Sequence, residues 1–118
     1  KEKYIEKHIN FDGKEIKFRS SGATPIRYKA QFGRDFLTDI YKLRDLEKIK
    51  NKKELTIKEM EKIDFDLFYN LTWDLAKTAD KTISEPIEWL DKFETFPVME
   101  IFGELQDIII STIQAKKK

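Results

Sequence analysis

Apolar and polar residues alternate at the start of the chain, over residues 5–18. Around the pair Asp12–Gly13, apolar residues recur at every second position, namely Ile9, Phe11, Ile16 and Phe18. An Asp-Gly pair between two alternating segments is typical of a two-residue hairpin turn, because a type I′ turn needs positive φ at both central positions. We therefore predict a β-hairpin with one apolar face. Since a lone hairpin is marginally stable in water, that face should pack on the rest of the protein.

Farther along the chain the apolar spacing changes to three and four residues, which is typical of helices. The pattern predicts four helices, over about 25–49, 57–79, 85–94 and 97–115. Thr24 and Pro25 suit the N-cap and the first position of the first of these helices. Gly33 lies inside the same helix at a cost of ~1 kcal/mol relative to Ala, and we expect close packing against a neighbouring backbone to explain it.

The second predicted helix carries signals for its start and for a break. Thr56 and Glu59 have the spacing of a capping box, which marks a helix N-terminus. Asp64 falls on the apolar side of the pattern. The helix therefore either continues through Asp64, or ends there and restarts with Asp64 as the cap. With a break, the predicted number of helices rises from four to five.

These elements predict a mainly α fold of the α+β class, in which an N-terminal β-hairpin packs on a bundle of four to five helices. A chain of 118 residues has the length of one domain, so we assign residues 1–118 to a single domain with one core. Seven apolar residues of the helical pattern are predicted to be buried in that core: Phe32, Phe36, Phe68, Leu71, Leu90, Phe102 and Leu105.

The last predicted helix has a wide apolar surface. Val98, Phe102 and Leu105 lie along its centre, with further apolar residues on both flanks. The apolar arc spans roughly 200°, whereas a helix that packs on one layer needs an arc of about 100°. The arc has two interpretations. Either the other helices surround this one, or one flank stays open as a docking surface for an apolar partner.

We place the candidate protein-binding surface on one flank of this arc. Its residues are Met99, Gly103, Ile110 and Ile113. Gly103 lies near the edge of the flank and would let a partner helix approach closely. Met99 would suit varied apolar partners, because the methionine side chain repacks easily. The same flank could also mediate self-association.

Charge and cysteine content narrow the classes of function. Charged residues make up 38% of the chain, but the formal net charge is only +1, so no overall electrostatic field would steer nucleic acid to it. The chain has no cysteine, which excludes disulfides and cysteine metal sites. No apolar stretch reaches the ~20 residues needed to span a bilayer, so we expect no membrane partner.

Few residues of the sequence are candidates for catalysis or metal binding. His8 is the only histidine, and one histidine forms neither a catalytic triad nor a zinc site without partners. Asp64 with Asp66 and Glu85 with Glu88 are candidate acid/base pairs, and Asp35 and Asp39, one turn apart, are a candidate cation site. Helix caps and solvated helix faces explain these pairs, and the sequence has neither a phosphate-binding glycine motif nor a nucleophile elbow. We therefore predict no enzyme, no cofactor and no metal.

Two lysine-rich runs bear on nucleic-acid binding. One contains Lys48, Lys50, Lys52 and Lys53, and the other consists of Lys116, Lys117 and Lys118. Neither run is interleaved with aromatic residues, as a platform for single-stranded nucleic acid would be, so we interpret both as solvated segments and expect no nucleic acid partner. The alternative function is a small nucleic-acid-binding regulator that uses the loop over 48–53. A DNA gel shift that weakens steeply with salt would favour it.

Several segments together resemble one protein family. They are residues 18–36 from Phe18 onward, residues 73–80 from Trp73 onward, and residues 88–93 with the sequence Glu-Trp-Leu-Asp-Lys-Phe. A Phe-Pro pair and a terminal amphipathic helix follow. In order and spacing, over nearly the whole chain, these segments resemble the tail assembly chaperones of long-tailed (siphovirus-type) phages and prophages of Gram-positive bacteria.

The resemblance implies a function in phage tail assembly. Such chaperones bind the tape measure protein in the host cytoplasm, keep it soluble and help to recruit tail tube subunits, and they are absent from the mature virion. The family often also makes a longer form by a translational frameshift, through which contact with the tail tube protein would be expected. The family has no shared catalytic residues, so the resemblance assigns none to this chain.

Overall fold

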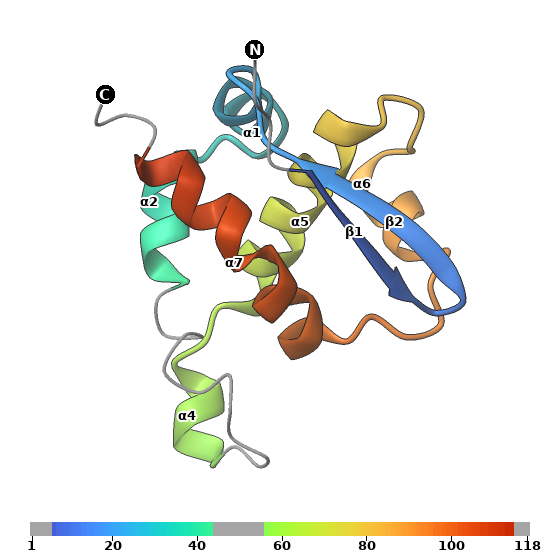
Figure 1. The fold of residues 1–118 in the computed structure, drawn as a ribbon. Helices are drawn as coiled ribbons and strands as arrows, with labels where there is room; N and C mark the ends of the chain where they lie inside the picture. The colour runs from blue at the N-terminus through green and yellow to red at the C-terminus, as the bar shows by residue number, and fades with distance from the viewer. Residues whose placement is uncertain (1–5, 44–55, 115–118) are drawn as a thin grey trace.

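The computed structural model of the chain describes residues 6–43 and 56–114, with side chains described up to residue 109. In chain order the elements are β1 (Glu6–Phe11), β2 (Lys14–Arg19), α1 (Thr24–Phe32), α2 (Phe36–Lys42), α4 (Ile57–Glu61), α5 (Phe65–Ala79), α6 (Pro86–Leu90) and α7 (Val98–Gln114) (Figure 1). An antiparallel hairpin thus precedes a set of helices, which confirms the predicted α+β fold class.

The hairpin has the predicted turn and the predicted apolar face. Asp12 and Gly13 have φ values of 54° and 72°, the positive values that a type I′ turn requires. The strands pair with Ile9 opposite Ile16, and Phe18 on the same face is fully buried. This face packs on the helices, with β2 against α5 and β1 beside α7 (Figure 1).

The first predicted helix is in fact two helices, so the prediction of one helix over 25–49 is wrong. α1 ends at Gly33, which has a left-handed φ of 69° and donates its N–H to the Lys29 carbonyl oxygen over 2.8 Å. α2 follows Asp35, whose side chain accepts from the Thr38 N–H over 2.9 Å. The predicted close packing at Gly33 is also wrong, because a Cβ there would meet no atom within 4 Å. The chain needs this glycine for its positive φ.

The start of α1 differs from the prediction by one residue. Ala23, not Thr24, is the N-cap residue, and it forms no side-chain capping bond. Thr24 is the first helical residue and is buried, and its Oγ1 accepts from the Ser21 N–H and lies 2.9 Å from the Thr78 hydroxyl. The predicted continuation of the first helix over 44–49 lies outside the described residues.

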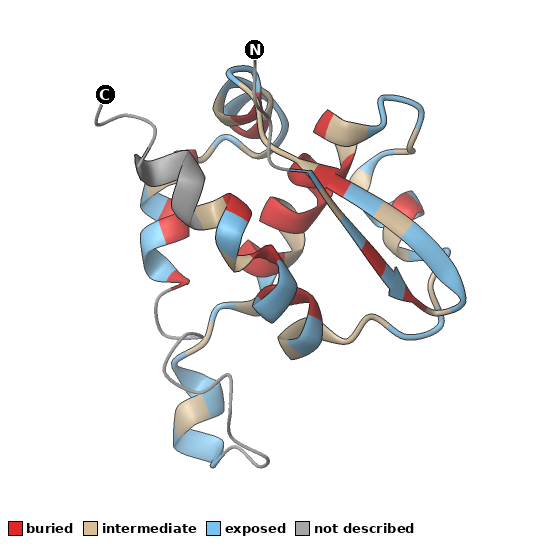
Figure 2. Ribbon diagram, viewed as in Figure 1, coloured by how far each residue is buried: buried red, intermediate tan, exposed pale blue. Residues whose placement is uncertain are grey.

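The capping predictions for the second helical segment are confirmed. Thr56 and Glu59 form the capping box at the start of α4. The helix then breaks, and the Asp64 carboxylate accepts from the Leu67 N–H at the start of α5. Every residue over 71–76 is buried, which makes α5 the central helix of the fold (Figure 2).

Two of the predicted core residues lie at the rim. The predicted helix over 85–94 ends at Leu90, and this short helix turns Trp89 rather than Leu90 fully into the core. Phe32 is also half-buried, because it is the last residue of α1 and packs from the end of that helix against Trp73. The other five are buried as predicted: Phe36, Phe68, Leu71, Phe102 and Leu105. None of the described helices combines the length and the apolarity needed to cross a membrane.

Candidate protein-binding surface

α7 packs on the core along one side. Its buried residues are Ile101, Phe102, Leu105 and Ile108, and its exposed ones are Glu100, Gly103, Glu104 and Asp107. The exposed residues turn away from the core, as the alternation of colours along α7 in Figure 2 shows. The exposed residues belong to the polar side of α7, whereas its apolar residues with described side chains are buried or half-buried, so both interpretations of the wide apolar arc remain open.

The edge of the buried side of α7 lies at Met99 and Gly103. Met99 is half-buried against the core, whereas Gly103, one turn later, is exposed. A Cβ placed on Gly103 would meet no atom within 4 Å, so no described part of the protein covers this position. The structure thus places two of the four predicted binding residues together on one flank. The side chains of the other two, Ile110 and Ile113, lie outside the described residues.

The other flank of α7 is closed. Ile101 and Ile108 have no exposed surface. β1 lies alongside α7, and an ion pair of 3.5 Å joins the Lys7 Nζ to the Asp107 carboxylate. Because the ion pair is partly exposed it adds little stability, so apolar contact is what fixes α7 against the hairpin. The flank of Met99 and Gly103 is left as the open one.

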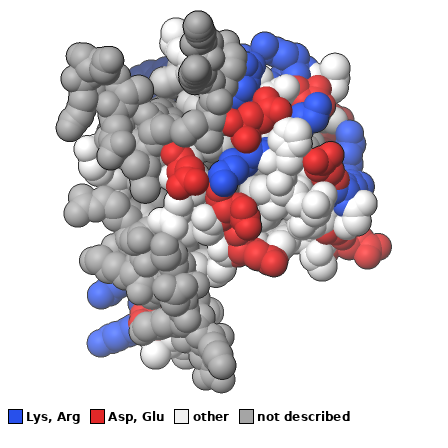
Figure 3. Space-filling view, viewed as in Figure 1, with Lys and Arg blue, Asp and Glu red and all other residues white. Residues whose placement is uncertain are grey.

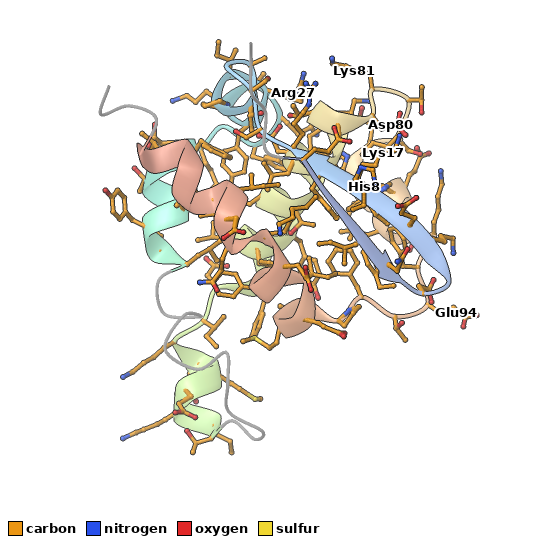
Figure 4. All side chains as sticks on the ribbon, in the orientation of Figure 1. His8, Lys17, Arg27, Asp80, Lys81 and Glu94 are labelled. Carbon is orange, nitrogen blue, oxygen red and sulfur yellow. The ribbon has the colours of Figure 1, made fainter. Side chains whose placement is uncertain are left out.

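An aromatic cluster anchors the start of α7. Phe96, just before the helix, lies edge-on to Phe11 of β1, with 5.3 Å between ring centroids. The hairpin turn holds the same segment, because Asp12 Oδ2 accepts from the Glu94 N–H over 3.1 Å (Figure 4). That hydrogen bond lowers the pKa of Asp12. The sequence identifies Asp12 only as a turn residue, since nothing in a sequence signals a contact with a residue 82 positions later.

Carboxylates from the candidate acid/base pairs and the candidate cation site have structural roles in the fold. Asp35 and Asp64 cap helices, and Asp39 is buried, where it accepts from the Tyr28 hydroxyl over 2.6 Å and from Arg34 Nε over 2.8 Å. Burial on its own would raise the pKa of Asp39. The bonds from Arg34 and Tyr28 outweigh burial and hold that pKa below its usual value.

His8 lies on the exposed face of the hairpin between two carboxylates (Figure 4). Its Nε2 is 2.7 Å from Glu6 and its Nδ1 is 3.1 Å from Glu15. The hydrogen bond with Glu6 and then the one with Glu15 raise the pKa of His8. Among the described residues, no group of three or more His, Asp or Glu side chains is arranged to hold a metal ion.

Asp74 in α5 is a buried carboxylate that the sequence analysis missed. Its side chain has no exposed surface, and no described residue forms a hydrogen bond with either of its oxygens. The nearest cation is Arg27 of α1, with its Nη1 at 3.6 Å (Figure 4). Burial outweighs this ion pair and raises the pKa of Asp74 to about 7. The helical pattern gives no sign of it, because α5 is enclosed on all sides at this point.

The two lysine-rich runs weighed for nucleic-acid binding, over 48–53 and 116–118, lie outside the described residues.

No protein family, curated protein or solved structure matches this chain.

Proposed function

We propose that this protein is a phage tail assembly chaperone. In this function it binds the tape measure protein in the host cytoplasm, keeps it soluble, helps to recruit tail tube subunits and is absent from the finished virion. The proposal includes no catalytic step. The structural observation that carries it is the open flank of α7 at Met99 and Gly103.

The segments that resemble the chaperone family support a shared fold rather than a shared interface. Phe18, Trp73 and Trp89, one from each segment, are all buried in the core. Residues of this kind are constrained by packing, so the segments say little about the surface that meets a partner. The flank itself indicates the class of partner.

The open flank suits an apolar helical partner. At Gly103 a partner helix would approach α7 where no described atom lies within 4 Å of the position of a Cβ. At Met99 it would meet a side chain that adapts its shape to different neighbours. A tape measure protein would offer many apolar segments along its length, so weak binding at each one adds up to stable coverage.

Co-expression with a helical fragment of the tape measure protein tests the proposal, with the soluble fraction of the fragment as the measurement. Gly103→Leu is expected to leave the fold intact, because the position is open, and to reduce the soluble fragment severalfold by blocking a close approach. The matched control is Glu104→Leu. It adds the same side chain at the next exposed position, which points away from the flank, and should leave solubilisation unchanged.

The outcomes separate the candidate functions. A folded Gly103→Leu variant that solubilises the fragment as well as the wild type does would show that the binding surface lies elsewhere. Ile110→Lys provides a second change on the predicted flank with the same expected loss. If the wild type solubilises no fragment and instead shifts DNA in a salt-dependent manner, the nucleic-acid-binding alternative replaces the chaperone.

A further inference from the structure

β1 has a free backbone edge. In the hairpin register Ile9 and Ile16 exchange hydrogen bonds between the strands, because the two-residue turn fixes which pairs are hydrogen-bonded. The residues on either side of Ile9, His8 and Asn10, therefore turn their backbone N–H and C=O groups away from β2. No other described residue forms a backbone hydrogen bond with them, so these groups are available to another strand.

A groove of about 250 Å³ runs between this edge and the start of α7. Residues 8–11 of β1 line one side of it, and Ile101, Glu100 and Glu104 of α7 line the other. The two elements lie side by side and run in opposite directions (Figure 1). The ion pair between Lys7 and Asp107 joins them beyond the groove. An extended segment in this groove would lie along both β1 and α7.

The α7 wall of the groove is acidic. Glu100 and Glu104 are both exposed, and no described Lys or Arg forms an ion pair with either of them. In Figure 3 several acidic side chains lie near the middle of the face shown, with a basic side chain among them. Two carboxylates without a cationic partner among the described residues, beside a free strand edge, favour a partner that is extended and basic.

The spacing of the two carboxylates matches that of a strand. Glu100 and Glu104 are four residues apart in a helix, which separates them by about 6 Å along its axis. In a β-strand, residues at i and i+2 share a face and lie about 6.6 Å apart. A strand beside β1 would therefore place two of its same-face side chains opposite Glu100 and Glu104.

We propose that this groove binds an extended, basic segment of another protein, which adds a third strand to the free edge of β1 and places Lys or Arg at every second position against Glu100 and Glu104. The strand edge supplies affinity through backbone hydrogen bonds, and the two carboxylates favour a positively charged segment over a neutral or negative one. This interaction does not depend on the proposed chaperone function and uses other residues.

A second copy of the chain is a poor occupant of this groove. In a symmetric dimer formed through the β1 edges, each α7 would bring its own Glu100 and Glu104 toward the same acidic region of the partner. Like charges at such a contact oppose association. The charge of the groove thus favours a different, basic chain.

Fluorescence anisotropy with the full chain tests the proposal, using the labelled peptide Ser-Lys-Val-Lys-Val-Lys-Ser as the probe. The wild type should bind it, and the double variant Glu100→Lys/Glu104→Lys should bind it at least roughly tenfold more weakly, because both carboxylates become repulsive. The matched control, Glu88→Lys/Asp91→Lys, makes the same charge change at exposed positions in and after α6, and should weaken binding less than about twofold.

Two further peptides test the strand addition. Each carries one N-methyl group on the backbone, at one or the other of two adjacent central residues. Backbone N–H groups of adjacent strand residues point in opposite directions, so one peptide should lose binding and the other should keep it. Equal binding by both would overturn the added strand. Three outcomes would overturn the whole proposal. The two charge variants could lose peptide affinity equally, a peptide with Glu in place of Lys could bind tightly, or the wild type could show no binding at millimolar peptide.

Discussion

Two buried aspartates show how strongly single residues in this core depend on their partners. Asp39 accepts hydrogen bonds from Tyr28 and Arg34, and its pKa lies below the usual value. Asp74 has no hydrogen bond from a described residue and only Arg27 at 3.6 Å, so its pKa rises to about 7. Ionised Asp39 therefore stabilises the fold, whereas ionised Asp74 destabilises it.

The raised pKa of Asp74 gives its contribution to stability a definite direction with pH. In the unfolded chain an Asp has a pKa of about 3.9. Between that value and about 7, folded Asp74 holds a proton that the unfolded chain has lost. The stability that this group contributes is therefore fully present below the unfolded pKa and is lost as the pH rises through about 7.

We expect Asp74→Asn to remove this loss. At pH 8 the variant should be more stable than the wild type by up to about 4 kcal/mol, because ionising a group whose folded pKa is raised costs about 1.4 kcal/mol per pKa unit and a neutral amide avoids that cost. In the variant Arg27 loses its ion pair but keeps another contact, because its Nη1 also donates to the Thr78 hydroxyl over 2.8 Å. Denaturant unfolding at pH 5 and pH 8 measures the effect, which should shrink at pH 5. Asp66→Asn, at an exposed position of the same helix, is the control, and lower stability of Asp74→Asn at pH 8 would contradict the prediction.

At the scale of elements, local signals predicted the turn and the caps at Thr56 and Asp64 correctly, but the predicted cap at Thr24 is wrong. The Asp-Gly turn, the capping box at Thr56 and the cap at Asp64 each depend on residues within four positions of one another. The break at Gly33 was missed because Phe32, Phe36 and Ile40 keep a spacing of four residues across it. A glycine that ends a helix and one inside a helix look alike when the apolar pattern continues.

The two glycines Gly33 and Gly103 should respond to alanine in opposite ways. Gly33 has a φ of 69°, so Gly33→Ala should cost about 1–2 kcal/mol for a left-handed residue with a Cβ. Gly103 lies inside α7 with open space around it, so Gly103→Ala should stabilise the protein by about 0.5–1 kcal/mol through helix propensity. Urea unfolding of both variants measures the contrast, and a destabilised Gly103→Ala would show that something covers this flank.

At the scale of the whole molecule, the sequence predicted the presence of a wide apolar arc on α7 but not which part of it is covered. Periodicity counts apolar residues around one helix, whereas coverage depends on where the hairpin and the other helices lie. The hairpin packs against the side of Ile101, and the segment before α7 is held by the contact of Asp12 with Glu94. Both arrangements join residues far apart in the chain, so no local pattern predicts them.

α7 carries both proposed surfaces, and the last prediction is that they work independently. The flank of Met99 and Gly103 would take the tape measure protein, whereas Glu100 and Glu104 line the groove on another side of the same helix. Gly103→Leu should therefore reduce solubilisation of the tape measure fragment severalfold and leave anisotropy with the basic peptide unchanged. Glu100→Lys/Glu104→Lys should do the reverse.

A competition measurement tests this independence directly. The labelled basic peptide is bound to the purified complex of the chain with the tape measure fragment, and the fragment should stay bound as the peptide saturates the groove. Two ligands that bind separate surfaces without a coupled conformational change neither help nor hinder each other. Displacement of the fragment by the peptide would mean that α7 has one binding surface rather than two. A loss of both activities in either variant, with the fold intact, would lead to the same conclusion.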